Sequence, residues 1–268
     1  MEWRFINSPM ADGCINMAID EAIMDCYSEG ERKPTLRIYG WNPPAVSIGY
    51  FQTVEKAVNV QACKEFGIDI VRRLTGGRAV LHEHEITYSI IIEENYPQLP
   101  KSIVESYKFL CRGILQGLKL AGADVSLESG RKNLREVSTQ ACFDSPSTYE
   151  IVCEGKKLVG SAQVRKNGII LQHGSILIDI DAVKHSSVLG RNKKEEQVLA
   201  QILEKKTTSL KQILGEDIKN KDIPDLIFKG YSEELGIRGK ISDLCPKEEL
   251  ARTELFKKYS SGDWTFSK

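Results

Sequence analysis

Apolar residues recur at helical spacing near the start of the chain. The face that they form would carry Ile15, Ala18, Ile19, Ala22, Ile23 and Cys26. This period predicts an amphipathic helix over residues 14–26. Asp12 stands where a side chain caps a first turn, and Gly30 marks the end of the pattern.

Shorter apolar stretches bounded by turn residues follow, and they predict strands over residues 35–40, 45–50, 69–73, 78–82 and 86–93. A helix is expected over residues 53–65, before Gly67. A longer helix should begin at the capping-box pattern Ser102-x-x-Glu105 and end at Gly122. Its apolar stripe would contain Ile103, Tyr107, Leu110, Ile114 and Leu118.

The second half of the chain changes character twice. Residues 130–147 are polar and indicate an irregular loop. Strands are then predicted over residues 149–153, 157–165 and 169–180, with Asn167-Gly168 as a type I′ hairpin turn. Residues 192–260 are rich in lysine and glutamate at helical spacing.

Strands in hairpins with helices between them favour an α+β fold of mixed sheets flanked by helices over a doubly wound one. The 268 residues, 41% of them hydrophobic, suffice for one sizeable core. We therefore expect a catalytic-type core over residues 1–190 and a helical C-terminal segment over residues 191–268 that packs on it.

Charge and cysteine usage narrow the function classes. Lys+Arg and Asp+Glu both number 37, so the net charge is zero and a polybasic nucleic-acid surface is not expected. The charged first residues lack a secretory h-region, and no apolar run reaches the roughly 20 residues of a membrane span. Seven scattered cysteines without a C-x-x-C pair argue against disulfides and zinc, and favour a cytosolic location.

Cys142 is the first candidate for chemistry. It lies in a polar loop stiffened by Pro146, fifteen residues before Lys157. A free thiol titrates near about 8.5, and a nearby ammonium favours the nucleophilic thiolate. A lone cysteine is more often a small buried hydrophobe, so only this context raises Cys142 as a nucleophile for acyl transfer.

Lys157 lies on a predicted strand. Residues 157, 159, 161, 163 and 165 should share one face, whereas Lys156 points the other way into solvent. The small residues Gly160, Ser161 and Ala162 leave room either for a ligand or for close strand packing, and the sequence leaves both interpretations open.

The segment from Arg72 to His82 places three arginines around Gly76-Gly77. The glycines alone would indicate a hairpin turn between two strands, whereas the arginines could hold an anionic group. A P-loop motif is absent.

The histidines offer further options. His82 and His84 are two residues apart on a predicted strand and should face the same side, so metal binding with Glu83, Glu85 or His173 can be imagined. No familiar ligand spacing supports a metal, and hydrogen-bonded histidines are favoured. His173 is also a minor candidate for the base that activates Cys142.

Several of these segments resemble known motifs. Residues 72–82 resemble the R-R-x-[ST]-G-G-G-A-V-x-H-D motif of the lipoate-protein ligase and octanoyltransferase family, and residues 157–162 resemble its K-[VIL]-x-G-S-A motif. Residues 39–43, 47–52, 142–147, 171–177 and 261–266 resemble the octanoyltransferase branch. The similarity spans nearly the whole chain through independent motifs.

The resemblance implies a biotin/lipoyl protein ligase catalytic-domain fold, with the family domain over about residues 33–240. It implies octanoyl transfer from acyl carrier protein to a lysine of a lipoyl domain, notably the glycine cleavage H protein. Cys142 would carry the acyl group, and Lys157 would lower its pKa and hold the acyl carbonyl. The substrate-binding residues would be Arg73, Thr75, Gly76, Gly77, Arg78, Ala79, His82, Gly160, Ser161, Ala162 and His173.

Two departures separate the chain from the ligases in this family. Arg78 stands in place of the third glycine, and residues 82–85 read H-E-H-E where the ligases have H-D-x-G. A bulky Arg78 disfavours an acyl-adenylate, so neither ATP nor a metal nor another cofactor is expected.

Three other functions stay open. An amidotransferase that moves octanoyl between lipoyl-type domains would use the same thiol chemistry. An ATP-dependent lipoate ligase would not need Cys142. A catalytically silent acyl-binding module on the same fold is the alternative from another class.

Overall fold

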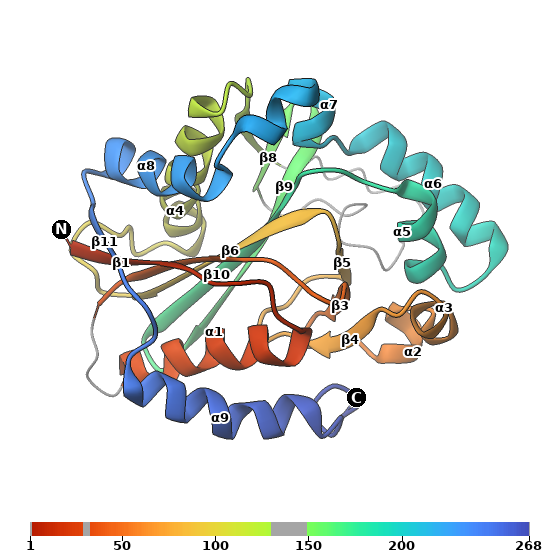
Figure 1. The fold of residues 1–268 in the computed structure, drawn as a ribbon, viewed down its shortest axis with the longest axis horizontal. Helices are drawn as coiled ribbons and strands as arrows, with labels where there is room; N and C mark the ends of the chain where they lie inside the picture. Colours follow the sequence, from red (N-terminus) through yellow and green to blue (C-terminus); the bar gives the residue numbers. More distant parts are fainter. Residues whose placement is uncertain (1, 29–32, 130–148, 268) are drawn as a thin grey trace.

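The computed structural model describes residues 2–28, 33–129 and 149–267. Two mixed β-sheets are flanked by helices, which confirms the predicted α+β class (Figure 1). In the described part of the chain the larger sheet has eight strands and the smaller has three.

The large sheet brings together segments that lie far apart in the sequence. Its strands, in spatial order, are β11 (Arg238–Ile241), β1 (Glu2–Asn7), β2 (Thr35–Tyr39), β6 (Glu85–Glu93), β10 (Ile169–Leu177), β9 (Lys156–Lys166), β8 (Tyr149–Cys153) and β7 (Ser126–Ser129). β1 pairs in parallel with both β11 and β2, and the other neighbours are antiparallel. The turn between β9 and β10 has positive φ at Asn167 and Gly168, as the predicted type I′ turn requires.

The small sheet has the order β4 (Asp69–Arg72), β3 (Ala45–Ile48) and β5 (Val80–His82). The fully buried β3 takes the centre, pairing in parallel with β4 and antiparallel with β5. The prediction of a hairpin at Gly76-Gly77 is therefore wrong, because β4 and β5 do not pair with each other. Residues 73–79 instead form a loop that crosses one end of β3.

Helices cover both faces of the large sheet (Figure 1). α1 (Gly13–Ser28) and α9 (Pro246–Ser260) lie on one face, and α4 (Ile103–Leu120) and α8 (Ile223–Leu235) lie on the other. The remaining helices are α2 (Val54–Ala57), α3 (Val60–Glu65), α5 (Ala182–Leu189), α6 (Lys193–Lys206), α7 (Leu210–Leu214) and the 3₁₀ helix η2 (Gly215–Asn220).

The predicted helix starts are partly correct. Asp12 Oδ1 accepts a hydrogen bond from Ile15 N at 2.8 Å, which confirms the cap of α1. The helix expected over residues 53–65 is split into α2 and α3, because Asn59 starts a new helix by accepting from Ala62 N. The expected capping box at Ser102 is wrong, since its side chain makes no cap hydrogen bond and Glu105 pairs with Lys108 instead.

The region after residue 190 is mostly helical, as expected, but it also supplies a strand. β11 extends the large sheet beside β1, and α9 packs on α1. The sequence did not indicate β11, which has only four residues, all exposed. The domain boundary near residue 190 stays a prediction.

Alternate side chains of β10 point to opposite faces of the large sheet. Leu171 packs toward Ile19 and Ile23 of α1, whereas Ile170 packs with the cluster that contains Leu110 and Ile114 of α4. His173 and Ser175 share the face of Leu171. This alternation places the polar side chains of β10 on the side of α1.

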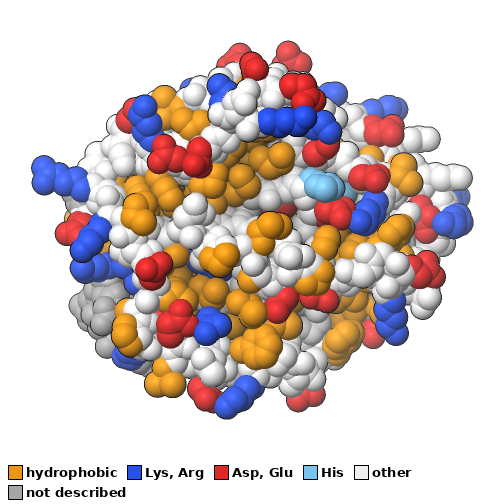
Figure 2. All heavy atoms as spheres, viewed as in Figure 1, with side chains coloured by type: hydrophobic (Ala, Val, Ile, Leu, Met, Phe, Trp, Pro, Cys, Tyr) orange, Lys and Arg blue, Asp and Glu red, His pale blue; other side chains and the backbone are white. Residues whose placement is uncertain are grey.

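None of the helices in the described ranges is both long and apolar enough to cross a membrane. Figure 2 shows charged side chains of both signs interspersed over one face of the molecule, with apolar side chains between them. On this face, positive and negative side chains are therefore not separated into a basic half and an acidic half.

Helices α4 and α8 pack closely through glycines. A Cβ atom on Gly230 would lie 2.3 Å from Gly117 N and 2.4 Å from Gly113 O. Gly230→Ala should therefore lower the free energy of unfolding by about 1–3 kcal/mol, although alanine favours helix intrinsically. Denaturant unfolding would measure this, with the exposed neighbour Lys229→Ala as the control; a stabilised Gly230→Ala would contradict the packing.

Candidate active site

A cavity of about 380 Å³, including its open mouth, lies between the large sheet, α1 and the small sheet. Six of the predicted site residues line it, namely Arg73, His82, Gly160, Ser161, Ala162 and His173. The other lining residues are Met17, Tyr39, Trp41, Ser47, Val80, Thr87, Gly174 and Ser175. Residues more than 150 positions apart in the sequence thus meet at one place.

Lys157 lies on β9, three residues before Gly160, which corresponds to about 10 Å along an extended strand. It does not line the cavity itself. The residue is 3% exposed, and Nζ donates to Glu150 Oε1 on the neighbouring strand β8 at 2.5 Å. Lys156 is exposed, so the predicted difference between the two lysines is confirmed.

Cys142 lies outside the described residues, so its place relative to Lys157 stays a prediction. Five further predicted residues belong to the crossing loop of residues 73–79. Thr75 contacts the cavity residue His173, whereas Gly76, Gly77, Arg78 and Ala79 do not line the cavity. Gly77 instead packs against Gly49, whose Cβ would lie 2.0 Å from Gly77 O.

Arg73 organises this loop from inside. Its guanidinium is buried and donates to Gly76 O at 2.9 Å, Arg78 O at 2.7 Å and Ser47 O at 2.7 Å. It also donates to two hydroxyls, Thr75 Oγ1 and Ser47 Oγ, both at 3.1 Å. A guanidinium can only donate, so each hydroxyl accepts from Arg73 and keeps its own proton for another partner.

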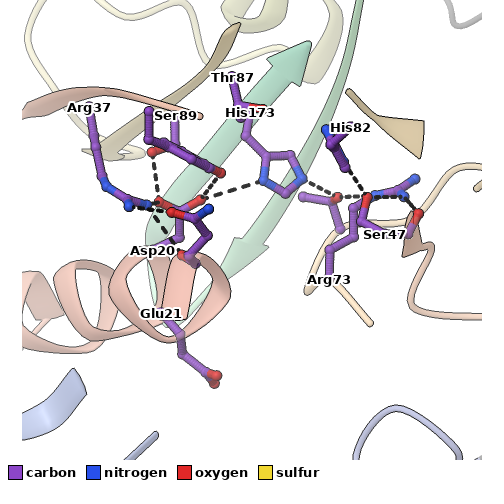
Figure 3. Close-up of polar contacts among 12 residues, drawn as sticks. Asp20, Glu21, Arg37, Ser47, Arg73, His82, Thr87, Ser89 and His173 are labelled. Carbon is purple, nitrogen blue, oxygen red and sulfur yellow. Dashed lines mark hydrogen bonds and ion pairs between the residues drawn. The ribbon is translucent and has the colours of Figure 1, made fainter. Parts of the chain in front are cut away.

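That partner is a histidine in both cases (Figure 3). Thr75 Oγ1 lies 2.6 Å from His173 Nε2, and Ser47 Oγ lies 2.8 Å from His82 Nε2. If each hydroxyl donates, both Nε2 atoms are acceptors and both imidazoles carry their proton on Nδ1. Each Nδ1 faces a carboxylate, at 3.7 Å for Asp20 and 3.4 Å for Glu85.

The result is one buried row of side chains in which Arg73 stands between two similar arms. The row contains Asp20, His173, Thr75, Arg73, Ser47, His82 and Glu85, and Figure 3 shows most of it. His173 Nε2 is engaged by Thr75, which argues against the minor option that His173 is the base for Cys142.

Asp20 anchors one arm. Oδ1 accepts from Arg37 and Ser89, both at 2.8 Å, and Oδ2 accepts from Tyr39 at 2.9 Å. Burial by itself would raise the pKa of Asp20, but the Arg37 guanidinium and His173 outweigh it and lower the pKa below 3.8. Burial lowers the pKa of His173 below its ordinary 6.5, and the Asp20 carboxylate only partly offsets this.

Glu85 anchors the other arm. It accepts from Ser175 Oγ at 2.5 Å and Thr87 Oγ1 at 2.7 Å, and Thr87 in turn accepts from Trp41 Nε1 at 2.8 Å. The Trp41 ring stacks on His82, with centroids 4.0 Å apart. The aromatic ring and the hydroxyls hold His82 in one orientation.

The prediction that His82 and His84 face one side is wrong. β5 ends at His82, and His84 lies in the following turn with φ of 50°. In the described part of the chain, no three His, Cys, Asp or Glu side chains are grouped as a metal ion would need.

The suggestion that the arginines hold an anion does not fit Arg72 and Arg73. Both guanidinium groups are buried and bond to backbone carbonyls of this chain. They shape the loop, because each carbonyl that they bind brings a piece of backbone to a defined position.

Sequence reasoning missed Asp20 and Arg37, and it considered Glu85 only as a metal ligand. Asp20 sits in α1, where the helical pattern directed attention only to the apolar face. A signal was present, since Asn16, Asp20 and Glu21 are polar residues in a largely apolar helix. Such residues on a buried helix need partners, and here they find Arg37, Tyr39 and Tyr259.

The buried histidines predict how stability depends on pH. The pKa values of His173 and His185 are lowered by burial, so the unfolded chain binds protons first as the pH falls. The free energy of unfolding should therefore decrease below pH 6.5, by up to about 1.4 kcal/mol per pH unit for each histidine.

Denaturant unfolding of wild type and His173→Gln between pH 7.5 and 5.5 measures this loss. The variant should show a shallower decrease, and His185→Gln in the same background should flatten it further. Equal slopes in wild type and the double variant would contradict the assignment.

Comparison with known proteins identifies the family of this chain. The model of the lipoyl protein ligase A/B catalytic domain matches residues 12–232. An octanoyltransferase LipM of Kyrpidia tusciae is 42% identical over 271 residues, covering 99% of both chains, and that of Staphylococcus aureus is 39% identical over 272 residues, also covering 99% of both.

Solved structures are similar over the same length. A bipartite lipoate protein ligase from Thermoplasma acidophilum superimposes with a TM-score of 0.81 at 25% identity, covering 99% of this chain and 96% of that one. A lipoate-protein ligase A bound with ATP gives a TM-score of 0.79 at 26% identity, covering 99% of each. This chain belongs to the lipoyl protein ligase A/B catalytic-domain family.

Proposed function

We propose that this protein is an acyltransferase of lipoate biosynthesis that moves an octanoyl group onto a lysine of a lipoyl-domain protein. Its relatives over the whole length are named octanoyltransferases. The observation that carries the proposal is the cavity of about 380 Å³ at the strand that bears the buried Lys157.

The cavity suits the acyl chain. Met17, Tyr39, Trp41 and Val80 give it apolar walls, and the small residues of β9 leave space beside the strand. A Cβ atom on Gly174 would lie 2.5 Å from Ser161 Oγ and 2.7 Å from Gly160 O, so the packing at this place requires glycine. Close strand packing is therefore present at Gly174, and we propose that Gly160 and Ala162 also leave room for the ligand.

Lys157 is the proposed partner of the reacting thioester. Burial and the 2.5 Å contact with Glu150 hold its amine in one place, unlike the amine of a solvated hairpin lysine. A fixed ammonium near Cys142 would favour its thiolate and would stabilise negative charge on the acyl carbonyl oxygen. The role of Cys142 is carried over from the family resemblance.

The proposed reaction has two steps. The Cys142 thiolate attacks the donor thioester carbonyl, a tetrahedral oxyanion forms, and the donor thiolate leaves as the octanoyl–Cys142 thioester appears. The amine of the target lysine then attacks this thioester, the C–S bond breaks, and Cys142 leaves as the thiolate. The proton that the amine loses as the amide forms passes to this thiolate or to a neutral Lys157. Thioester exchange nearly conserves free energy, so the proposal requires neither ATP nor a metal.

The acceptor is a lipoyl-domain protein, and we propose the glycine cleavage H protein in particular. Octanoyl-acyl carrier protein is the proposed donor. We also expect a cytosolic location, which is supported by the six described cysteines that are free thiols.

One assay separates the proposal from its nearest alternatives. Octanoyl-acyl carrier protein, octanoyl H protein, and free octanoate with ATP are offered as donors in parallel. Preference for the first supports the transferase, preference for the second identifies an amidotransferase, and ATP-dependent use of octanoate identifies a ligase. Octanoate that binds without any transfer would indicate a silent acyl-binding module.

The proposed intermediate can be observed directly. After incubation with octanoyl-acyl carrier protein, mass spectrometry should find an octanoyl adduct on Cys142 that hydroxylamine removes. Cys142→Ala should abolish the adduct, whereas Cys245→Ala should not. An adduct of normal yield on Cys142→Ala would overturn the mechanism.

The two neighbouring lysines give a matched pair of variants. Lys157→Met should slow formation of the adduct by about 10²–10³-fold, because charge stabilisation at the carbonyl is lost. Lys156→Met, one residue away and exposed, should retain the wild-type rate. Similar rates for the two variants would remove Lys157 from the mechanism.

A further inference from the structure

The C-terminal turn is bound to the same strand end that shapes the cavity. Arg72, the last residue of β4, is fully buried, and its guanidinium donates to five carbonyls from two segments. Three belong to the turn after β3, Gly49 O at 3.1 Å, Tyr50 O at 3.0 Å and Gln52 O at 2.6 Å. Two belong to the C-terminal turn, Trp264 O at 3.1 Å and Thr265 O at 2.7 Å.

The C-terminal turn also binds the backbone of Arg72. Trp264 Nε1 donates to Arg72 O at 2.9 Å, and Arg72 N donates to Thr265 Oγ1 at 3.3 Å. The Trp264 ring lies 5.7 Å from the Tyr50 ring and 4.0 Å from Lys258 Nζ. Residues 262–266 are therefore attached to β4 and to the turn of residues 49–52 at once.

One peptide bond connects this attachment to the cavity. Arg72 and Arg73 are consecutive in an extended segment, so their side chains point in opposite directions. Arg72 is directed to the C-terminal turn, whereas Arg73 reaches Ser47, Thr75 and the backbone of the crossing loop. In addition, Gly49 in the turn bound by Arg72 packs directly on Gly77 of that loop.

We propose that residues 262–266 are a positioning element for the acyl-binding cavity. Without them, two buried N–H groups of Arg72 lose their acceptors, and leaving such donors unsatisfied is costly. Arg72 then reorients, the turn of residues 49–52 loosens, and the crossing loop with Arg73 shifts. Trp264 and Thr265 thus act on the reaction through Arg72 and Arg73. The inference rests on the proposed function for its kinetic part only.

Two changes test the proposal with increasing severity. Thr265→Val removes the acceptor for Arg72 N with little change of shape, and a chain that ends after Ser261 removes the whole turn but leaves α9 intact. Asp263→Asn is the matched control, because this side chain is exposed in the same turn. Tm values establish that each variant is folded.

The first readout is hydrogen–deuterium exchange and does not depend on the proposed function. The shortened chain should take up deuterium faster at residues 47–52 and 73–79, and β10 on the far side of the cavity should be unchanged. Unchanged exchange at residues 73–79 would overturn the proposal.

The second readout is transfer of hexanoyl, octanoyl and decanoyl groups from acyl carrier protein. If a variant only had a smaller folded fraction, its apparent kcat would fall by the same factor for the hexanoyl, octanoyl and decanoyl groups, and its KM would be unchanged. A displaced cavity wall should instead raise KM for octanoyl by at least about tenfold and change the ratio of rates between hexanoyl and decanoyl. Thr265→Val should show a smaller change in the same direction, and Asp263→Asn should match wild type.

The two hypotheses fail in different ways. A wild-type protein without transfer activity contradicts the proposed function, while the exchange experiment still decides the role of the turn. A wild-type protein with normal transfer, together with a shortened chain of unchanged KM and unchanged chain-length ratio, contradicts the role of the turn alone.

Discussion

The site depends on two adjacent buried guanidinium groups, Arg72 and Arg73. Each carries five N–H groups that cannot remain unsatisfied in a dry interior, so backbone carbonyls must surround them. The turn after β3, the crossing loop and the C-terminal turn supply those carbonyls. Segments without regular structure are thereby held in defined places, which a cavity lined by loops requires.

The same constraint sets the chemistry of the cavity wall. Arg73 donates to Thr75 and Ser47, and this orders the hydroxyls toward His173 and His82. Carboxylates behind both imidazoles complete the row, and every charge in it has a partner. Most polar groups of this wall bond to one another, so an apolar substrate can lie against it at little cost in unpaired polar groups. The exception in the row is His82 Nδ1, which is buried without a hydrogen-bond partner among the described residues. In the proposed mechanism the reactive groups come from elsewhere, from β9 with Lys157 and from the segment that carries Cys142.

Local patterns were sufficient for much of the fold and part of the site. Helical spacing located α1 and α4, and Asn167-Gly168 located the turn between β9 and β10, because these features depend on neighbouring residues. The pairing of strands that lie far apart in the sequence could not be predicted from local patterns. β4 and β5 look like a hairpin in the sequence and are separated by β3 in the sheet, and β11 joins β1 from the other end of the chain. Asp20 was missed, and Glu85 was considered only as a metal ligand, for the same reason, since their partners come from other elements.

The central claim is that the cavity organised by Arg73 holds the acyl chain of a thioester whose carbonyl lies at Lys157. A crystal structure of the protein trapped after reaction with octanoyl-acyl carrier protein tests it most directly. The account predicts the octanoyl chain between β9, β10 and the small sheet, with its carbonyl oxygen within hydrogen-bonding distance of Lys157 Nζ. A chain bound outside this cavity, or a carbonyl remote from Lys157, would contradict it.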